Sequence, residues 1–197
     1  SRSWSRGKAL WIRKLQQGLR IPLLAGNDSH GDLNRYRSIG TPFVSVVEGF
    51  DRFLGAVRTG VYGRPSSSNE LLELIRQGRT FVTDGPMLCL SRSPEVEECI
   101  VSKRDTLLGS FDAVHLIARS TAEFGALSSL KVFLYGYGMK AETTVLSRCY
   151  GPDTYECCEK MPVADIKSNC YIRAELWSVL PSGDTRRAAT SACFLVK

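Results

Sequence analysis

The sequence has few of the residues that most metal centres need. Only two of its 197 residues are histidine, His30 and His115, and none of its seven cysteines belongs to a C-x-x-C pair. The usual ligand spacing of a structural zinc site is therefore absent. Long apolar runs are also missing. The run at residues 21–26 stops at Asn27 and Asp28, far short of the roughly 20 apolar residues that cross a membrane. We expect a soluble protein, or at most a peripheral one.

The cysteines are odd in number, and several of them lie in apolar, strand-like runs. This pattern favours buried free thiols over disulfides and indicates a reducing, cytoplasmic compartment. The adjacent pair Cys157 and Cys158 leaves a redox or metal-binding role open.

Positive charge is concentrated near the start of the chain. Residues 1–37 hold eight basic and two acidic side chains, whereas the other 160 residues balance, with 18 of each sign. A positive field around the segment that contains Asp28 would attract an anionic substrate such as a phosphoester. Alternatively, a preceding part of the protein carries the compensating carboxylates. The first residues include neither an initiator methionine nor a signal peptide, so we expect the chain to begin inside a longer protein.

The first elements resemble the end of an α/β unit. Residues 7–20 place Trp11, Leu15 and Leu19 four positions apart among basic side chains, which predicts an amphipathic helix that unwinds near Gly18. The apolar run "IPLLAG" follows almost without a loop. Such a run is typical of a strand that is buried on both faces.

The next segment is irregular and leads to a second helix. Residues 31–68 contain one candidate strand, "FVSVV", and "SSNELLELIRQG" predicts a helix with a capping box at Ser67 and a stop at Gly78. In "GRTFVTDGP", the side chains of Arg79, Thr83 and Asp84 could line a substrate cleft. We favour the structural interpretation, in which "TFV" is a strand and Asp-Gly-Pro is a turn.

The pattern changes after residue 86. Short apolar or alternating runs, separated by Gly, Pro, Asp and Ser clusters, predict an all-β sandwich domain at residues 87–197. A hairpin turn at residues 180–185 is expected to join its last two strands. We place the domain boundary near Pro86, with an α/β portion at residues 1–86.

The stretch "GNDSHGDLNR" carries the clearest chemical signal. Residues i and i+2 of a strand point to the same face, so Asp28 and His30 would project together from the end of the apolar run. Carboxylate and imidazole are good ligands for zinc, manganese or iron. On its own, D-x-H occurs often by chance. The structural alternative has Asp28 capping a turn and His30 hydrogen-bonded in a loop.

These residues resemble a known family. "GNDSHGDLNR", preceded by a helix ending in "QQGLRIP" and followed by "LLELIRQGRTFVTDGP", is similar to the C-terminal part of a PHP (polymerase and histidinol phosphatase) domain, in members with an appended β-sandwich. The resemblance implies the end of a distorted β/α barrel whose His, Asp and Glu cage holds up to three divalent metal ions. It also implies hydrolysis of a phosphorylated small molecule by metal-activated water, with Asp28 and His30 as metal ligands.

The chain also departs from the family. A PHP site needs an early H-x-H pair and further His and Glu ligands, whereas the only other histidine here is His115, which we interpret as structural. The chain alone is therefore predicted to be inactive, and the enzyme, if there is one, is a longer polypeptide. Near the D-x-H motif, Asn34, Arg35 and Arg37 are candidates to bind the substrate phosphate, or else they form a solvated loop face.

Two other functions compete with a hydrolase. One is a non-catalytic β-sandwich interaction or carbohydrate-binding module that carries a degenerate barrel remnant. The other, which is the weakest, is nucleic-acid binding through the basic residues near Trp4 and Trp11, because Trp11 belongs to the apolar stripe of its helix.

Overall fold

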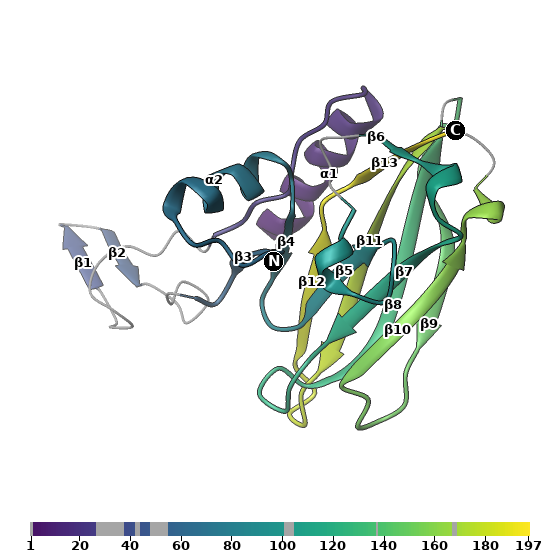
Figure 1. The fold of residues 1–197 in the computed structure, drawn as a ribbon. Helices are drawn as coiled ribbons and strands as arrows, with labels where there is room; N and C mark the ends of the chain where they lie inside the picture. The colour runs from purple at the N-terminus through teal and green to yellow at the C-terminus, as the bar shows by residue number, and fades with distance from the viewer. Residues whose placement is uncertain are drawn as a thin grey trace.

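The computed structural model of the chain describes residues 2–26, 38–41, 44–47, 55–100, 105–136, 138–166 and 169–197. β-Strands are the commonest element among them, and they build two sheets that face each other (Figure 1). Two α-helices come from the N-terminal part of the chain: α1 (Arg2–Gln16) and α2 (Ser68–Arg76). Among the described residues there is no closed barrel.

The larger sheet is built around β11 (Cys170–Val179). On one side β11 pairs along its whole length with β8 (Ala126–Gly136), which in turn pairs with β9 (Thr143–Cys149). On its other side β11 pairs with two strands that follow each other, β12 (Thr185–Thr190) and β13 (Cys193–Val196). The outer strands are β3 (Arg58–Val61), β4 (Thr80–Thr83) and β6 (Asp105–Leu107). The first two of these extend the sheet beyond β12, and β6 runs parallel to β13.

The smaller sheet has the order β10–β7–β5 and is antiparallel. Its strands are β5 (Met87–Ser91), β7 (Ala113–Arg119) and β10 (Glu156–Pro162). Short 3-10 helices follow or precede these strands: η2 (Val96–Glu98) follows β5, η3 (Leu108–Ser110) precedes β7 and η4 (Val163–Asp165) follows β10. A separate strand pair, β1 (Ser38–Thr41) with β2 (Val44–Val47), lies within the irregular segment, and β2 matches the last four residues of the predicted "FVSVV" run.

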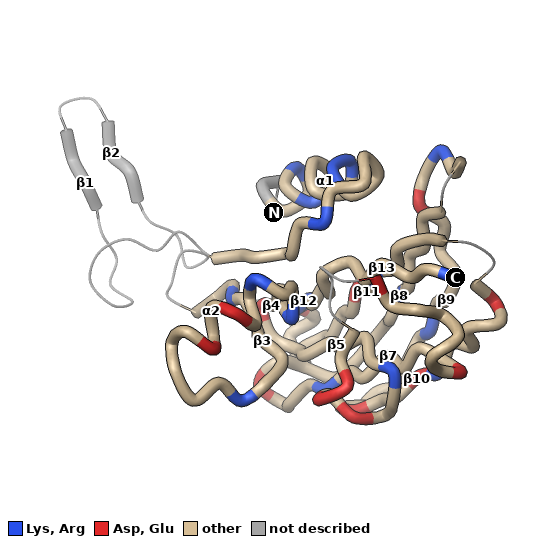
Figure 2. The backbone as a smooth tube through the Cα atoms, turned by 45° about the horizontal axis from the view of Figure 1, so that its top comes forward, with Lys and Arg blue, Asp and Glu red and all other residues tan. Residues whose placement is uncertain are grey.

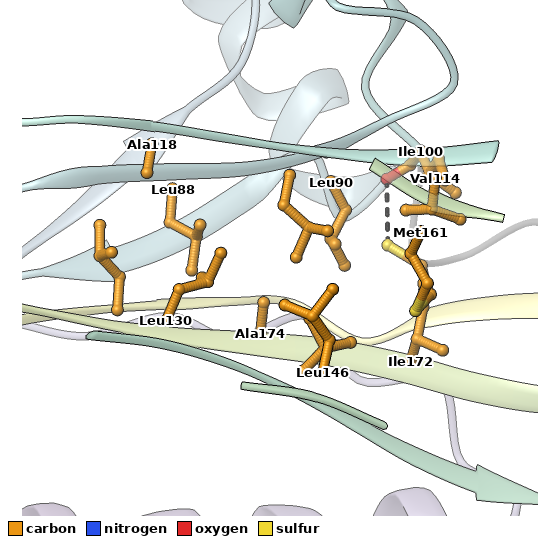
Figure 3. Close-up of a cluster of buried hydrophobic side chains, with 14 of the residues drawn as sticks. Leu88, Leu90, Ile100, Val114, Ala118, Leu130, Leu146, Met161, Ile172 and Ala174 are labelled. Carbon is orange, nitrogen blue, oxygen red and sulfur yellow. Dashed lines mark hydrogen bonds between the residues drawn. The ribbon is translucent and has the colours of Figure 1, made fainter. Parts of the chain in front are cut away.

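One hydrophobic core fills the space between the two sheets (Figure 3). Alternate residues of each strand point inward, as the period of two requires. From the smaller sheet come Leu88, Leu90 and Val114, and from the larger sheet come Leu130 and Ile172. The predicted sandwich pattern of residues 87–197 is thus seen as two facing sheets, although β3 and β4 lie before residue 86 and join the larger one.

The helix α1 packs on the outer face of the larger sheet. Trp11 and Leu15 are buried there, in a second apolar cluster with Leu23, Val82 and Tyr171. The helix begins and ends about one turn earlier than predicted, at Arg2 and Gln16. Leu19, expected on the buried stripe, lies beyond the helix and is exposed, because the chain leaves the helical path at Gly18, whose φ is +84°.

The second helix, α2, forms where the sequence predicts it. Ser67 is the N-cap and accepts a hydrogen bond from the Glu70 backbone N–H at 3.2 Å, and Gly78 follows the helix with a φ of +73°. The Glu70 carboxylate reaches Ser66 instead of closing the box on Ser67. No residue of α2 is buried: Leu74 and Ile75 are half-buried, whereas Leu71 and Leu72 are exposed.

Several strands match the predicted runs, but the sequence does not predict five of the described ones. β1, β3, β6, β10 and β12 are short or carry many polar residues, so they lack an apolar signal. The turn at residues 180–185 forms as expected. It joins β11 to β12 instead of the last two strands, because β13 follows β12.

Candidate functional site

The predicted metal and phosphate ligands lie outside the described residues. This holds for Asp28, His30, Asn34, Arg35 and Arg37. The structure describes the chain up to Gly26, so it shows the residues that lead to this segment.

The segment at residues 21–26 is extended, but it is not the buried strand that its sequence predicts. Its backbone groups bind side-chain hydroxyls of the larger sheet instead of the backbone of a neighbouring strand. The Leu23 N–H donates to Ser191 Oγ at 2.8 Å, and Thr80 Oγ1 donates to the Leu23 carbonyl at 3.1 Å. Further along, Thr59 Oγ1 contacts both the N–H and the carbonyl of Ala25, each at 2.9 Å. The segment thus crosses the sheet with side chains as its hydrogen-bond partners.

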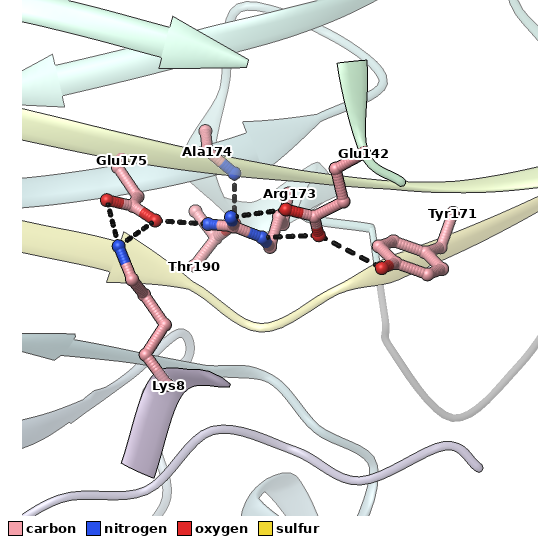
Figure 4. Close-up of polar contacts among 7 residues, drawn as sticks. All are labelled: Lys8, Glu142, Tyr171, Arg173, Ala174, Glu175 and Thr190. Carbon is pink, nitrogen blue, oxygen red and sulfur yellow. Dashed lines mark hydrogen bonds and ion pairs between the residues drawn. The ribbon is translucent and has the colours of Figure 1, made fainter. Parts of the chain in front are cut away.

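The helix α1 is fixed to the same sheet by polar contacts. Trp11 Nε1 donates to the Ile21 carbonyl at 2.8 Å, which joins the helix to the extended segment. Lys8 Nζ binds both carboxylate oxygens of Glu175 on β11, at 2.9 and 3.0 Å (Figure 4). The apolar face of the helix therefore includes a partly buried ionic contact.

Glu175 belongs to a longer buried network. Its carboxylate also pairs with Arg173, whose guanidinium is held from the other side by Glu142 through Nε at 2.8 Å and Nη2 at 2.6 Å (Figure 4). Tyr171 Oη donates to the same Glu142 carboxylate at 2.9 Å. Burial alone raises the pKa of Glu175, but Arg173 and Lys8 outweigh it and hold that pKa below the ordinary value. The network connects α1 to the sheet, and its two positive and two negative side chains balance in charge.

These contacts also bear on the positive charge near the N-terminus. Figure 2 shows basic but no acidic positions along α1. Lys8 is paired with Glu175, and Arg20 Nη2 lies 2.5 Å from Asp105 Oδ1. Part of the excess is therefore neutralised by carboxylates of the C-terminal part, while Arg6 and Arg13 remain exposed on the helix.

A cavity of about 290 Å³ lies beside the first turns of α1. Trp4, Thr83, Asp84, Thr185 and Arg187 line it together with Val57, Val82 and Ala188. Three of these residues, Trp4, Val57 and Val82, belong to the apolar cluster against which Ala25 also packs. The cavity therefore borders the same apolar cluster as Ala25, the residue before Gly26.

The residues of "GRTFVTDGP" have mainly structural contacts. Thr83 Oγ1 donates to the Pro86 carbonyl at 2.6 Å and accepts from the Gly85 N–H at 2.8 Å, which closes the turn. Asp84 holds β12 through the backbone of Arg187. Arg79 Nε points to Cys99 Sγ at 3.2 Å and does not line the cavity. Of the three cleft candidates, Thr83 and Asp84 are at the cavity and Arg79 is elsewhere.

No family model matches this chain, and we found no match among the curated proteins or the solved structures. Across the described ranges, no group of three or more His, Cys, Asp or Glu side chains is placed to hold a metal ion. No described helix has both the length and the apolar character needed to cross a membrane.

The cysteines are free thiols, and four of the seven are buried. Cys157 and Cys158 are neighbours on β10 and so point to opposite faces. Cys157 Sγ contacts Tyr150 Oη at 3.2 Å and packs against the core, where burial raises the pKa of its thiol. Cys158 is exposed, with its Sγ 3.8 Å from His115 Nδ1. Two thiols on opposite faces cannot bind one metal ion together.

Sequence reasoning missed the cavity, because four separate segments contribute to it. Trp4 lies on α1, Val57 precedes β3, Thr83 ends β4 and Arg187 lies on β12. One signal was present in the helix: Trp4, Lys8, Trp11 and Leu15 recur at helical spacing, which places Trp4 on the face that meets the sheet.

Proposed function

We propose that this chain is the C-terminal part of a PHP-type metal-dependent hydrolase, a phosphoesterase that acts on a phosphorylated small molecule. In this proposal residues 1–86 belong to the end of a distorted β/α barrel, and residues 87–197 form an appended β-sandwich domain. Asp28 and His30 are ligands of its divalent metal ions. The order of helix, extended segment, D-x-H motif, second helix and strand supports it.

One observation carries the proposal: four large apolar side chains are exposed on the helix and the extended segment that lead to Asp28. The exposed fractions are 57% for Leu10, 46% for Leu19, 41% for Ile21 and 52% for Leu24. Large apolar side chains exposed together usually mark a surface that another element covers. A neighbouring strand and helix of a barrel would cover this one, and a strand could also bind the extended segment through its backbone.

The helix α2 supports the same interpretation. It has a strong apolar face, yet Leu71 and Leu72 are exposed and none of its residues is buried by the described chain. A helix of this length is marginal in water without packing partners. A larger α/β portion would supply packing partners for its exposed leucines.

The proposed chemistry needs few residues of this chain. A bound divalent ion lowers the pKa of a coordinated water and polarises phosphoryl oxygens. Asp28 and His30 have suitable ligand atoms, but one Asp and one His are too few for a cluster of two or three ions. Asn34, Arg35 and Arg37 would orient the phosphate, with arginine able to bind two of its oxygens at once.

The test measures metal content and phosphatase activity on the complete polypeptide that the gene encodes. We expect two or three equivalents of zinc, manganese or iron by mass spectrometry, and hydrolysis of p-nitrophenyl phosphate. The double variant Asp28→Ala, His30→Ala should lose metal and activity, because both ligands leave the cage. Residues 1–197 alone should be inactive.

The matched control is His115→Ala, which removes the other histidine. His115 lies on β7 in contact with Cys158, and its loss should leave metal content and activity unchanged. A complete polypeptide that binds no metal would refute the proposal. So would phosphatase activity of residues 1–197 alone that depends on His30, since it would show that one Asp and one His suffice.

A further inference from the structure

The smaller sheet carries a thiol beside an imidazole. Cys158 lies on β10 and His115 on β7, which are neighbouring strands (Figure 1), and Cys158 Sγ is 3.8 Å from His115 Nδ1. In the register of the two strands Cys158 is opposite Ile117, two positions after His115. The thiol and the imidazole are therefore diagonal neighbours on one face of the sheet.

Both side chains point away from the core between the two sheets. Side chains alternate along a strand, and the residues next to these two, Cys157 on β10 and Val114 and Leu116 on β7, belong to that core or pack against it. Cys158 is exposed and His115 is half-buried. Since β10 is also the outermost strand of the smaller sheet, a reagent in solution can reach the thiol.

The imidazole is placed to accept the proton of the thiol. Among the described residues, Cys158 Sγ is the one hydrogen-bond partner of the His115 ring. Partial burial, and then the positive charge of Lys160, lower the pKa of His115 below its ordinary value of 6.5. The ring is therefore mainly neutral at pH 7, which is the form that can act as a base.

From this geometry we propose that Cys158 is a modification site, whose thiol exchanges with low-molecular-weight disulfides while His115 acts as the base. His115 Nδ1 takes the thiol proton, and the thiolate attacks one sulfur of the disulfide. A new S–S bond joins Cys158 to one half of the reagent as the original S–S bond breaks. The departing thiolate takes the proton from the imidazolium. One disulfide is consumed and one is formed, so the step needs no other oxidant.

The surrounding charges favour an acidic disulfide such as glutathione disulfide. Lys160 is exposed and lies two positions after Cys158, so it is on the same face and attracts an anionic reagent. Further along this face Arg119 and Glu156 pair with each other at 3.8 Å and balance in charge. This site does not depend on the proposed hydrolase activity, because it includes no residue of the D-x-H motif.

Cys149 is a matched control within the same chain. It ends β9 and is exposed, as Cys158 is, but its thiol forms no hydrogen bond with the part of the chain that the structure describes. The other five cysteines are buried or half-buried. A difference in reaction rate between Cys149 and Cys158 therefore reports the neighbouring groups and not exposure alone.

The test incubates the complete polypeptide with glutathione disulfide at neutral pH and follows the mixed disulfides by mass spectrometry. Trypsin releases residues 149–160 as one peptide that contains both exposed cysteines, so its fragment spectra compare them directly. We expect Cys158 to react about tenfold faster than Cys149 or more. This is less than a fully aligned base contributes, because the thiol–imidazole contact is 3.8 Å long.

Two variants separate the base from the charge. His115→Gln should slow Cys158 to about the rate of Cys149 and leave Cys149 unchanged, because an amide cannot take up a proton. Lys160→Gln should slow the reaction with glutathione disulfide more than that with cystamine, a cationic disulfide. Both side chains lie outside the core, so the thermal midpoint should change little and report that each variant folds.

Equal rates at Cys149 and Cys158 in the unmodified sequence would overturn the proposal. An unchanged Cys158 rate in His115→Gln, with an unchanged thermal midpoint, would do the same. If His115→Gln instead speeds the reaction at Cys158, the histidine shields the thiol and is not its base. None of these outcomes bears on the metal content or phosphatase activity of the polypeptide, which test the proposed function separately.

Discussion

The buried network around Arg173 predicts that Glu142→Gln is strongly destabilising. The substitution keeps the shape of the side chain but removes the charge that holds the guanidinium through Nε and Nη2. Lys8, Arg173, Glu142 and Glu175 carry two positive and two negative charges, so the variant leaves one positive charge in excess. The hydroxyl of Tyr171 also loses its charged acceptor.

The magnitude follows from burial. The exposed fraction of the Arg173 side chain is 3%, and that of Glu142 is 10%. Removing one partner of a buried ion pair typically costs about 3–5 kcal/mol. We expect the lower end, about 3 kcal/mol, because Glu175 still pairs with Arg173 and glutamine retains one acceptor oxygen. For a chain of this size, that corresponds to a fall in the thermal midpoint of roughly 6–12 °C.

The assay is urea unfolding followed by circular dichroism, with Glu98→Gln as the matched control. Glu98 pairs with Arg92 at 2.6 Å, the same distance as between Glu142 and Arg173, but the side chains are 48% and 47% exposed. Such a pair contributes less than about 1 kcal/mol. If the two variants lose stability to within about 0.5 kcal/mol of each other, burial does not determine the strength of these pairs.

Two further predictions concern pH and the extended segment. Because the folded-state pKa of Glu175 is lowered, its ion pairs stabilise the fold above the ordinary value of 4.5 and are lost as the pH falls through the folded-state pKa. The free energy of unfolding should therefore decrease at acidic pH, and less steeply in Glu175→Gln. If both proteins show the same slope, another group is responsible. Ser191→Ala should cost about 1–2 kcal/mol, because it leaves the Leu23 N–H without its acceptor. Hydrogen exchange at Leu23 should accelerate, with the exposed Ser182→Ala as control, and unchanged protection at Leu23 would contradict the assigned contact.

The sequence predicts the strongly patterned elements and misses those that tertiary contacts define. The runs that became β5, β7, β9 and β11 are apolar enough to be recognised alone. β12 reads "TRRAAT" and is fixed by its pairing with β11 and β4 instead. Lys8 lies on the apolar stripe of α1 because it pairs with Glu175, which is 167 residues further along the chain. A local pattern cannot contain such a partner.

The candidate site shows the same division. The D-x-H motif is visible in the sequence because its two residues are close together, and its segment lies outside the described residues. By contrast, the cavity at Trp4 and Arg187 is assembled from a helix and strands that are far apart in the sequence. The apolar run before the motif predicts a strand, because composition indicates burial but does not reveal whether a β-ladder or side-chain hydroxyls bind the backbone.

The contacts of residues 21–26 fix this extended segment to the larger sheet. Thr59, Thr80 and Ser191 belong to that sheet or its connections, and their hydroxyls bind the backbone of Leu23 and Ala25. Because these strands come from both sides of residue 86, the end of the α/β portion and the β-sandwich share hydrogen bonds and apolar contacts. A variant that breaks these bonds should therefore loosen residues 21–26 without disrupting the core between the two sheets.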